Sequence, residues 1–167
     1  MKVLVTGHLG YIGTVLTPML TAAGHEVHGL DSDLFSRCTY GSMPASVPEL
    51  IKDVRDVELE DVCGFDAVLH LAGLSNDPLG DLDSDLTYEI NHRASVRLAE
   101  LCKEAGVERF IFSSSCSNYG AGSNDLLTED GELNPVTPYG KSKVMVEKDL
   151  APMGSDDFTP VFLRNAT

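Results

Sequence analysis

Basic residues are scarce in this sequence: 12 lysines and arginines stand against 26 aspartates and glutamates, which gives a net charge of −14. A protein that binds nucleic acid presents a positive surface to the phosphates, so this balance argues against a nucleic-acid partner. Because the overall field repels anions, an anionic ligand would have to be held by local dipoles and a few cations.

Long apolar runs are absent as well. A membrane-spanning helix needs about 20 consecutive apolar residues, so we expect no contact with a membrane. Met1 and Lys2 lead directly into a strand pattern, so we expect no signal peptide and a cytoplasmic location. The 167 residues contain no repeat or low-complexity segment, which predicts one domain over 1–167.

Cysteines in metal-binding pairs are also missing. The four cysteines form no C-x-x-C motif and no cluster with histidine: Cys38, Cys63, Cys102 and Cys116. We therefore expect neither a metal site nor a disulfide framework. Cys102 falls within an apolar helical pattern and is interpreted as a core residue.

The stretch VLVTGHLGYIG, at 3–13, organises the rest of the chain. Its apolar start at 3–5 is typical of a buried parallel strand, and a helical pattern follows over 11–23. Between them, glycines recur at a three-residue spacing: Gly7, Gly10 and Gly13. In dinucleotide-binding units with this order, exposed N–H groups and the helix N-terminus hold a pyrophosphate.

Each glycine has a physical role in that setting. Gly7 lets the chain turn sharply, Gly10 leaves room for the pyrophosphate, and Gly13 lets the helix pack closely on the sheet. No lysine follows as in a P-loop, which disfavours a nucleoside triphosphate with Mg²⁺.

An acidic residue ends the next predicted strand, which covers 27–30. Asp31 lies 18 residues after Gly13, near the spacing of about 20 expected for a carboxylate that binds the adenosine ribose. Such a carboxylate would repel a 2′-phosphate, so the pattern favours NAD over NADP. The alternative is a glycine-rich turn in another α/β protein, with Asp31 acting only as a helix cap.

Strand and helix patterns alternate along the remainder of the chain. Further strands are predicted at 50–54, 67–72, 109–112 and 159–163. Helices are predicted at 57–62, 86–105 and 138–150, and loops at 32–48, 74–85 and 116–136. This alternation predicts an α/β fold, a Rossmann-like doubly wound parallel sheet with strand order 3-2-1-4-5-6.

Tyr139 and Lys143 are four residues apart and share one face of the helix predicted over 138–150. A nearby ammonium favours the phenolate. A tyrosine with an ordinary pKa of about 10 needs a shift of roughly three units, about 4 kcal/mol, to act as a base near neutrality. We expect a buried ammonium and a positively charged nicotinamide to supply it. The alternative is an exposed pair on a surface helix.

Three serines, 113–115, follow the strand predicted at 109–112. They stand at its carboxyl end, where ligands bind in open α/β sheets. A hydroxyl there could hydrogen-bond the oxygen that the tyrosine deprotonates. The alternative is a polar strand end without a chemical role.

Together these motifs resemble the extended short-chain dehydrogenase/reductases, in their nucleotide-sugar epimerase/dehydratase branch. The resemblance covers essentially the whole chain, and the YGKSKVMVE stretch and the serine triple are similar to those of UDP-galactose 4-epimerases. The matching stretches are TGHLGYIG at 6–13, LD at 30–31, KDVRD at 52–56, HLAG at 70–73, Asn91, FSSSCSNYG at 112–120 and YGKSK at 139–143.

The resemblance implies NAD as the cofactor. The implied contacts are, for the pyrophosphate, Gly7, Gly10, Tyr11, Ile12 and Gly13; for the adenosine ribose, Asp31; for the adenine, Asp53 and Val54; and for the middle of the cofactor, Leu71, Ala72 and Gly73.

The resemblance also implies an epimerase of the oxidoreductase type that acts on a nucleotide sugar. Asn91 would support the active-site geometry, Ser115 would orient the substrate hydroxyl, and Tyr139 would accept its proton. Lys143 would bind the nicotinamide ribose and lower the pKa of Tyr139. Hydride transfer to NAD then gives a keto-sugar, and epimerases return the hydride on the other face, whereas dehydratases first eliminate water.

Family members continue into a carboxyl-terminal domain that binds the sugar nucleotide. We therefore expect that substrate domain to be largely absent from this chain, which is either part of a longer enzyme or completed by a second chain. The helices at 86–105 and 138–150 resemble those of the family's four-helix dimer interface, which implies a homodimer.

The chain departs from the family pattern at a few positions. Ser75 stands where galactose epimerases carry a lysine, and Cys116 and Asn118 replace small and aliphatic residues. No acid directly follows Ser115, which disfavours a sugar dehydratase. A dehydratase or reductase of the family remains an alternative, as does a non-catalytic NAD-binding regulator, although such regulators tend to lack the tyrosine–lysine pair.

Overall fold

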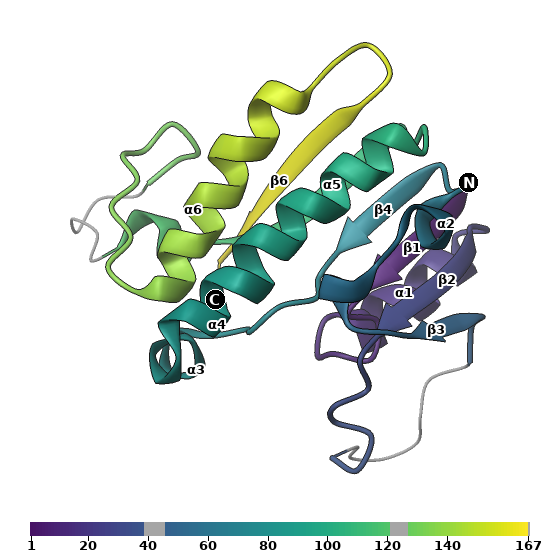
Figure 1. Cartoon of the computed structure of the whole chain (residues 1–167), viewed down its shortest axis with the longest axis horizontal. Coiled ribbons are helices and arrows are strands. Elements are labelled where there is room, and N and C mark those ends of the chain that lie inside the picture. Colours follow the sequence, from purple (N-terminus) through teal and green to yellow (C-terminus); the bar gives the residue numbers. More distant parts are fainter. Residues whose placement is uncertain (39–45, 121–126, 167) are drawn as a thin grey trace.

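The computed structural model describes residues 1–38, 46–120 and 127–166. Its centre is a fully parallel sheet of six strands in the order β3-β2-β1-β4-β5-β6 (Figure 1), which confirms the predicted Rossmann-like topology. The strands are β1 (Lys2–Thr6), β2 (Glu26–Asp31), β3 (Glu49–Ile51), β4 (Ala67–His70), β5 (Arg109–Ser115) and β6 (Thr159–Asn165).

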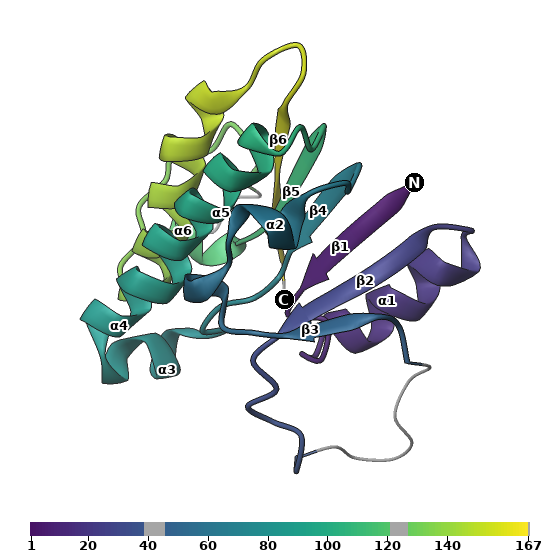
Figure 2. The ribbon, with the colours of Figure 1, turned by 45° about the vertical axis from the view of Figure 1, so that its right-hand side comes forward.

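Helices cover both faces of the sheet. The α-helices are α1 (Gly13–Ala22), α2 (Leu59–Val62), α3 (Asp77–Leu82), α4 (Ser84–Tyr88), α5 (Ala94–Glu104) and α6 (Pro138–Leu150). Figure 2 shows α1 on one face and α5 and α6 on the other. Short 3-10 helices are η1 (Val54–Asp56), η3 (Cys116–Tyr119) and η4 (Ala151–Met153), and η2 (Glu89–Arg93) is a π-helical turn.

Alternation along the strands divides the core between these two layers. On β1, Val3 and Val5 belong to a small cluster with Val27, whereas Leu4 belongs to the larger cluster with Phe110 and Phe112. Successive side chains of a strand point to opposite faces, so β1 is buried on both sides. Cys102 lies fully buried in the larger cluster, as predicted.

The prediction of a loop over 74–85 is wrong, because this segment contains α3 and the start of α4. Two side-chain caps explain the helices. Asn76 accepts a hydrogen bond from the backbone N–H of Leu79 at 2.9 Å, and Asp83 accepts one from Leu86 at 2.9 Å. Such caps satisfy N–H groups that the first helical turn leaves free.

Other boundaries also differ from the predictions. The helix predicted at 86–105 is divided by the π-helical turn η2, and β3 is shorter than the strand predicted at 50–54. On α1 the buried residues are Gly13 and Thr17, while Met19 is 62% exposed. Parts of the loops predicted at 32–48 and 116–136, namely 39–45 and 121–126, lie outside the described residues.

Within the described residues, every helix is too short or too polar to cross a membrane. Across the same ranges, no group of three or more histidine, cysteine, aspartate or glutamate residues is placed to hold a metal ion.

Candidate functional site

The glycine turn lies directly after β1, at the carboxyl edge of the sheet. The Gly7 N–H donates to the Leu30 carbonyl at 2.8 Å, and the Gly10 N–H donates to the Gly7 carbonyl at 3.0 Å. Gly7 has φ +74°, and a Cβ there would lie 2.7 Å from the Ala72 nitrogen. The turn therefore needs glycine at position 7 for both its conformation and its closeness to the chain after β4.

Gly13 begins α1 and brings the helix close to the same turn. A Cβ at Gly13 would collide with the Gly7 carbonyl and the backbone of His8. Tyr11 and Ile12, between Gly10 and Gly13, are 95% and 45% exposed. The turn thus presents backbone and two exposed side chains to solvent at the start of a helix.

Asp31 ends β2 beside this turn. One carboxylate oxygen accepts the Leu9 N–H at 3.0 Å, and the other accepts the Asp33 N–H at 3.0 Å. The side chain therefore holds the glycine turn against the end of β2. Each carboxylate oxygen retains acceptor capacity, so Asp31 can also bind a hydroxyl.

Asp53 follows β3 at the same edge but already has a strong partner. Its carboxylate accepts the Arg55 backbone N–H at 2.9 Å and the guanidinium at 3.0 and 2.8 Å. These bonds from Arg55 lower the pKa of Asp53. Val54 is buried in the larger core cluster. If the Asp53 side chain contacted an adenine, its carboxylate would therefore bind both the adenine and Arg55.

The segment after β4 lies next to the glycine turn and is supported by Asn91. Leu71 and Ala72 donate their N–H groups to Thr6, at 3.1 Å to its carbonyl and 3.3 Å to its hydroxyl. Asn91 accepts the Leu74 N–H at 2.7 Å and donates to the Leu74 carbonyl at 3.0 Å. A Cβ at Gly73 would lie 2.9 Å from the Asn91 oxygen, so this contact requires glycine.

Ser115 and Tyr139 meet at the carboxyl end of β5. Ser115 is buried and lies close enough to Tyr139 to influence its pKa. Burial raises the pKa of Tyr139, the neighbouring Asp77 and Cys116 act in the same direction, and Ser115 acts against them. The helix start that carries Tyr139 is capped by Thr137, whose hydroxyl accepts the Gly140 N–H at 3.1 Å.

Lys143 lies one turn further along α6 and is 5% exposed. Its ammonium donates to the Ser113 carbonyl at 2.8 Å and lies 5.7 Å from the centre of the Tyr139 ring. Burial lowers the pKa of Lys143 to about 8. The predicted lowering of the tyrosine pKa by this lysine is not found among the chain's own contacts, because burial dominates and the ammonium is directed to a backbone carbonyl.

The serine turn, which consists of Ser115 and η3, is supported by a buried ion pair. This ion pair was not predicted from the sequence. Glu147 is 6% exposed and pairs with Arg164 at 2.7 Å. Its other oxygen accepts the Ser114 hydroxyl at 2.6 Å and the Asn118 amide at 2.8 Å. The network joins β5, η3, α6 and β6, and it explains why an amide stands at position 118 in place of an aliphatic residue.

His70 is a second buried polar residue whose role was not predicted. Its ring nitrogens lie 2.6 Å from the Thr6 hydroxyl and 2.8 Å from the Ser95 hydroxyl. Burial, assisted by the charge of Lys143, lowers the pKa of His70 to about 3. The ring is therefore neutral near pH 7 and links β1, β4 and α5.

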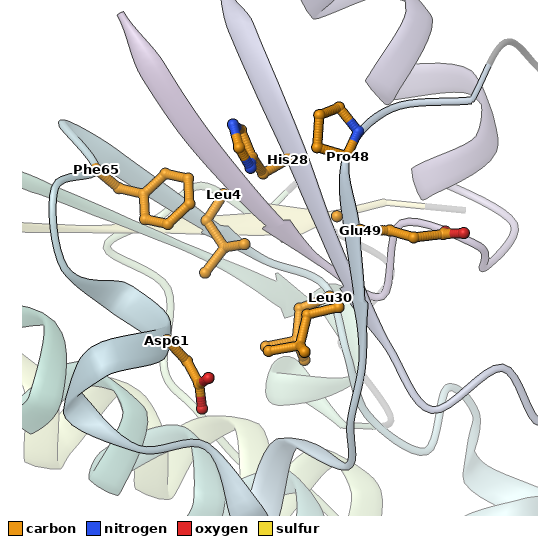
Figure 3. A pocket seen from close by; sticks show the side chains of 9 residues that line it. Leu4, His28, Leu30, Pro48, Glu49, Asp61 and Phe65 are labelled. Carbon is orange, nitrogen blue, oxygen red and sulfur yellow. The ribbon is translucent and has the colours of Figure 1, made fainter.

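A cavity of about 170 Å³ lies elsewhere, between β2, β3 and α2 (Figure 3). Leu4, Leu30 and Phe65 line it, together with His28 and Glu49. It contains none of the predicted site residues. The candidate site is instead the open carboxyl edge of the sheet, where the structure brings together the glycine turn, Asp31 and the segment after β4 in one half, and Ser115 with the tyrosine–lysine pair in the other.

The arrangement defines a class of protein. A strand, a glycine turn and a helix at the point where the strand order reverses, with an acid ending the second strand, make a Rossmann-type domain. The helix that follows β5 adds a buried lysine one turn after a tyrosine. A family model described as the NAD dependent epimerase/dehydratase family matches residues 3–167, and the chain belongs to that family.

Known proteins of similar sequence and structure agree with this assignment. A UDP-glucose 4-epimerase from Azospirillum brasilense is 35% identical over 158 residues, which are 92% of this chain and 45% of that protein. A UDP-glucose 4-epimerase from Thermus thermophilus, solved in complex with NAD, is 30% identical with a TM-score of 0.83, over 98% of this chain and 54% of that one.

A third similar structure has a different activity in its name. It is an NAD-dependent NDP-hexosamine 5,6-dehydratase involved in tunicamycin biosynthesis, 28% identical with a TM-score of 0.88 over 98% of this chain and 54% of that chain. The chain thus spans about half the length of the relatives it matches.

Proposed function

We propose that this chain binds NAD across the carboxyl edge of its sheet and forms the cofactor half of an enzyme that epimerises a nucleotide sugar. The observation that carries the proposal is the placement of Ser115, Tyr139 and Lys143 at the same sheet edge as the glycine turn. The similar UDP-glucose 4-epimerases support the reaction type, and the absence of a lysine in the turn favours a dinucleotide over a nucleoside triphosphate.

The residues present fit NAD. Gly10 is exposed at the turn and offers room for a pyrophosphate, and the start of α1 supplies N–H groups and the positive end of the helix dipole. The spare acceptor capacity of Asp31 suits a ribose diol and opposes a 2′-phosphate. Leu71, Ala72 and Gly73, beside the turn, would line the middle of the cofactor.

The chain's own side chains would then act on the substrate. Ser115 would orient a sugar hydroxyl, and Tyr139 would take its proton. Lys143, at 5% exposure, would bind the nicotinamide ribose and hold a positive charge near the phenol. Bound NAD supplies the acceptor of the hydride from the sugar carbon. Asn91 would keep the segment after β4 in place.

A dehydratase of the same family is the second candidate, and the similar NDP-hexosamine 5,6-dehydratase favours it. Elimination of water calls for an acid and a base beside the sugar in addition to the tyrosine. Cys116 and Ser117 follow Ser115, and neither is a carboxylic acid. Epimerisation therefore stays the first choice.

The helices at 86–105 and 138–150 would also form the interface of a homodimer. Light scattering on the concentrated chain tests this part separately. A mass near 18.0 kDa at high concentration would contradict it.

The test of the activity uses the longest polypeptide that contains this chain and a panel of UDP-, GDP- and dTDP-sugars. Epimerisation predicts a new sugar nucleotide of unchanged mass, whereas dehydration predicts a product lighter by one water. Tyr139→Phe should abolish turnover and leave NAD binding intact. Full activity of that variant would contradict the role of Tyr139.

A further inference from the structure

Asp77 joins the two segments that carry Ser115 and Tyr139. It lies in the first turn of α3, which packs beside the start of α6 (Figure 1). One carboxylate oxygen accepts the Thr137 hydroxyl at 2.5 Å, and the other accepts the Ser117 hydroxyl at 3.4 Å. Among the side-chain hydrogen bonds of the described residues, those of Asp77 alone reach both Ser117, in the turn after β5, and Thr137, the cap of α6.

Each partner of Asp77 is itself bonded to the site. The Thr137 hydroxyl that donates to Asp77 also accepts the Gly140 N–H at 3.1 Å and so caps the helix that begins with Pro138 and Tyr139. The Ser117 N–H donates to the Ser115 hydroxyl oxygen at 3.1 Å. A continuous set of hydrogen bonds therefore runs from the tyrosine helix through Asp77 to the catalytic serine.

Close packing brings α3 against the tyrosine itself. A Cβ on Gly80 would lie 3.1 Å from the Tyr139 Cβ, so there is no space for a side chain between the two helices. Thr87 bonds the Gly80 carbonyl at 3.0 Å and thereby fixes the end of α3. The helix that carries Asp77 is thus fixed against the start of α6 by packing as well as by hydrogen bonds.

We propose that Asp77 is a positioning residue, whose two carboxylate oxygens hold the serine turn and the start of the tyrosine helix at a fixed separation. The inference rests on the roles proposed above for Ser115 and Tyr139. The charge of Asp77 also acts on the phenol and raises the pKa of Tyr139. The other groups that face the phenol are Ser115 from β5, Cys116 from η3 and Lys143 from α6 itself.

Two substitutions separate the bonds from the charge. Asp77→Asn keeps an acceptor for Thr137 and a donor for Ser117 but removes the charge. Asp77→Ala removes the bonds and the charge together. Asp81→Asn is the control, because Asp81 is exposed on the same helix and its change alters the net charge equally.

Hydrogen exchange on the intact chain tests the bonds. Asp77→Ala should exchange about tenfold faster at 116–119 and 137–141 than the wild type, as expected for the loss of charge-assisted hydrogen bonds. The exchange rates of Asp77→Asn should stay close to those of the wild type at both segments, and the exchange rates of Asp81→Asn should equal those of the wild type. Unaltered exchange in Asp77→Ala, or an equal rise throughout β1 to β3, would overturn the positioning role.

An absorbance titration of the phenols tests the charge and needs neither NAD nor a sugar. The contribution of Tyr139 is obtained by subtracting the absorbance curve of the Tyr139→Phe variant from that of the corresponding protein with Tyr139. In Asp77→Asn the midpoint of the Tyr139 titration should move to lower pH, because a negative charge is removed. In Asp81→Asn the midpoint should stay where it is in the wild type. An unmoved titration in Asp77→Asn would overturn the placement of the carboxylate, whereas loss of NAD binding would affect only the proposed function.

Discussion

The two halves of the sheet edge are built from different kinds of contact. In the half formed by β1 to β3, the glycine turn is closed by backbone hydrogen bonds, and Asp31 is its main side-chain partner. In the half formed by β4 to β6, side chains such as Asn91 and Glu147 hold the segments together. The first half is therefore held mainly by backbone contacts with one supporting carboxylate, and the second mainly by contacts between side chains and their neighbours.

The largest effect is expected from breaking the buried ion pair of the second half. Glu147→Ala leaves Arg164, whose side chain is 18% exposed, without its carboxylate partner. The free energy of unfolding should fall by about 3 kcal/mol, because an unpaired charge remains partly buried. Denaturant titration measures it.

Glu104→Ala is the control for this experiment, since Glu104 is exposed on α5. Its effect should stay within about 0.5 kcal/mol. Equal effects of the two substitutions would show that the second half does not depend on the buried network.

Crowding at the glycine turn should give the next largest effect. Gly7→Ala must adopt φ +74° and place a Cβ 2.7 Å from the Ala72 nitrogen, which should cost about 2 to 3 kcal/mol of unfolding free energy. Gly24→Ala has a similar φ of +87° but open space around it, so it should cost only about 1 kcal/mol. If thermal denaturation gives the same loss for both, the close approach at Gly7 is not important.

The sequence predicted the first half of the edge well because its signals are local. A strand, spaced glycines and an acid are close enough along the chain to be recognised together. The sheet order was predicted from the alternation of strands and helices along the chain, and the shared helix face of Tyr139 and Lys143 from their four-residue spacing. Asp77, Glu147 and Arg164 were missed, since their partners are between 17 and 60 residues away and nothing nearby marks them.

The segment around α3 shows a second reason for failure. Its acids and glycine were interpreted as a loop, although Asn76 followed by Pro78 is also a helix start. The pKa of Tyr139 shows a third, because burial by the folded chain raises it, while the lysine that the sequence places one turn away donates to the Ser113 carbonyl.

Acid should destabilise the fold through His70, which links β1 in the first half to β4 and α5 in the second. An unfolded histidine binds a proton near pH 6.5, whereas the pKa of buried His70 is about 3. Between these values the unfolded chain binds more protons, so the free energy of unfolding falls by about 1.4 kcal/mol for each pH unit as the pH decreases.

Replacing His70 isolates this contribution. His70→Asn should have a shallower decrease of unfolding free energy between pH 6.5 and 4 than the wild type, measured by denaturant titration at each pH. His28→Asn, at a partly exposed position, is the control for replacing a histidine by asparagine. An unchanged slope in His70→Asn would contradict the buried neutral ring.

The most direct test of the proposed cofactor site is a fluorescence titration of the chain with NADH, for the wild type and for Gly10→Val. Gly10 is exposed, although a Cβ there would lie 3.1 Å from the Gly7 carbonyl oxygen, so the valine should lower the melting temperature slightly while it fills the space offered to the pyrophosphate. We predict saturable binding by the wild type and a loss of affinity of about tenfold or more, about 1.4 kcal/mol, in the variant. Equal affinity in both proteins, or no saturable binding by the wild type, would contradict the account.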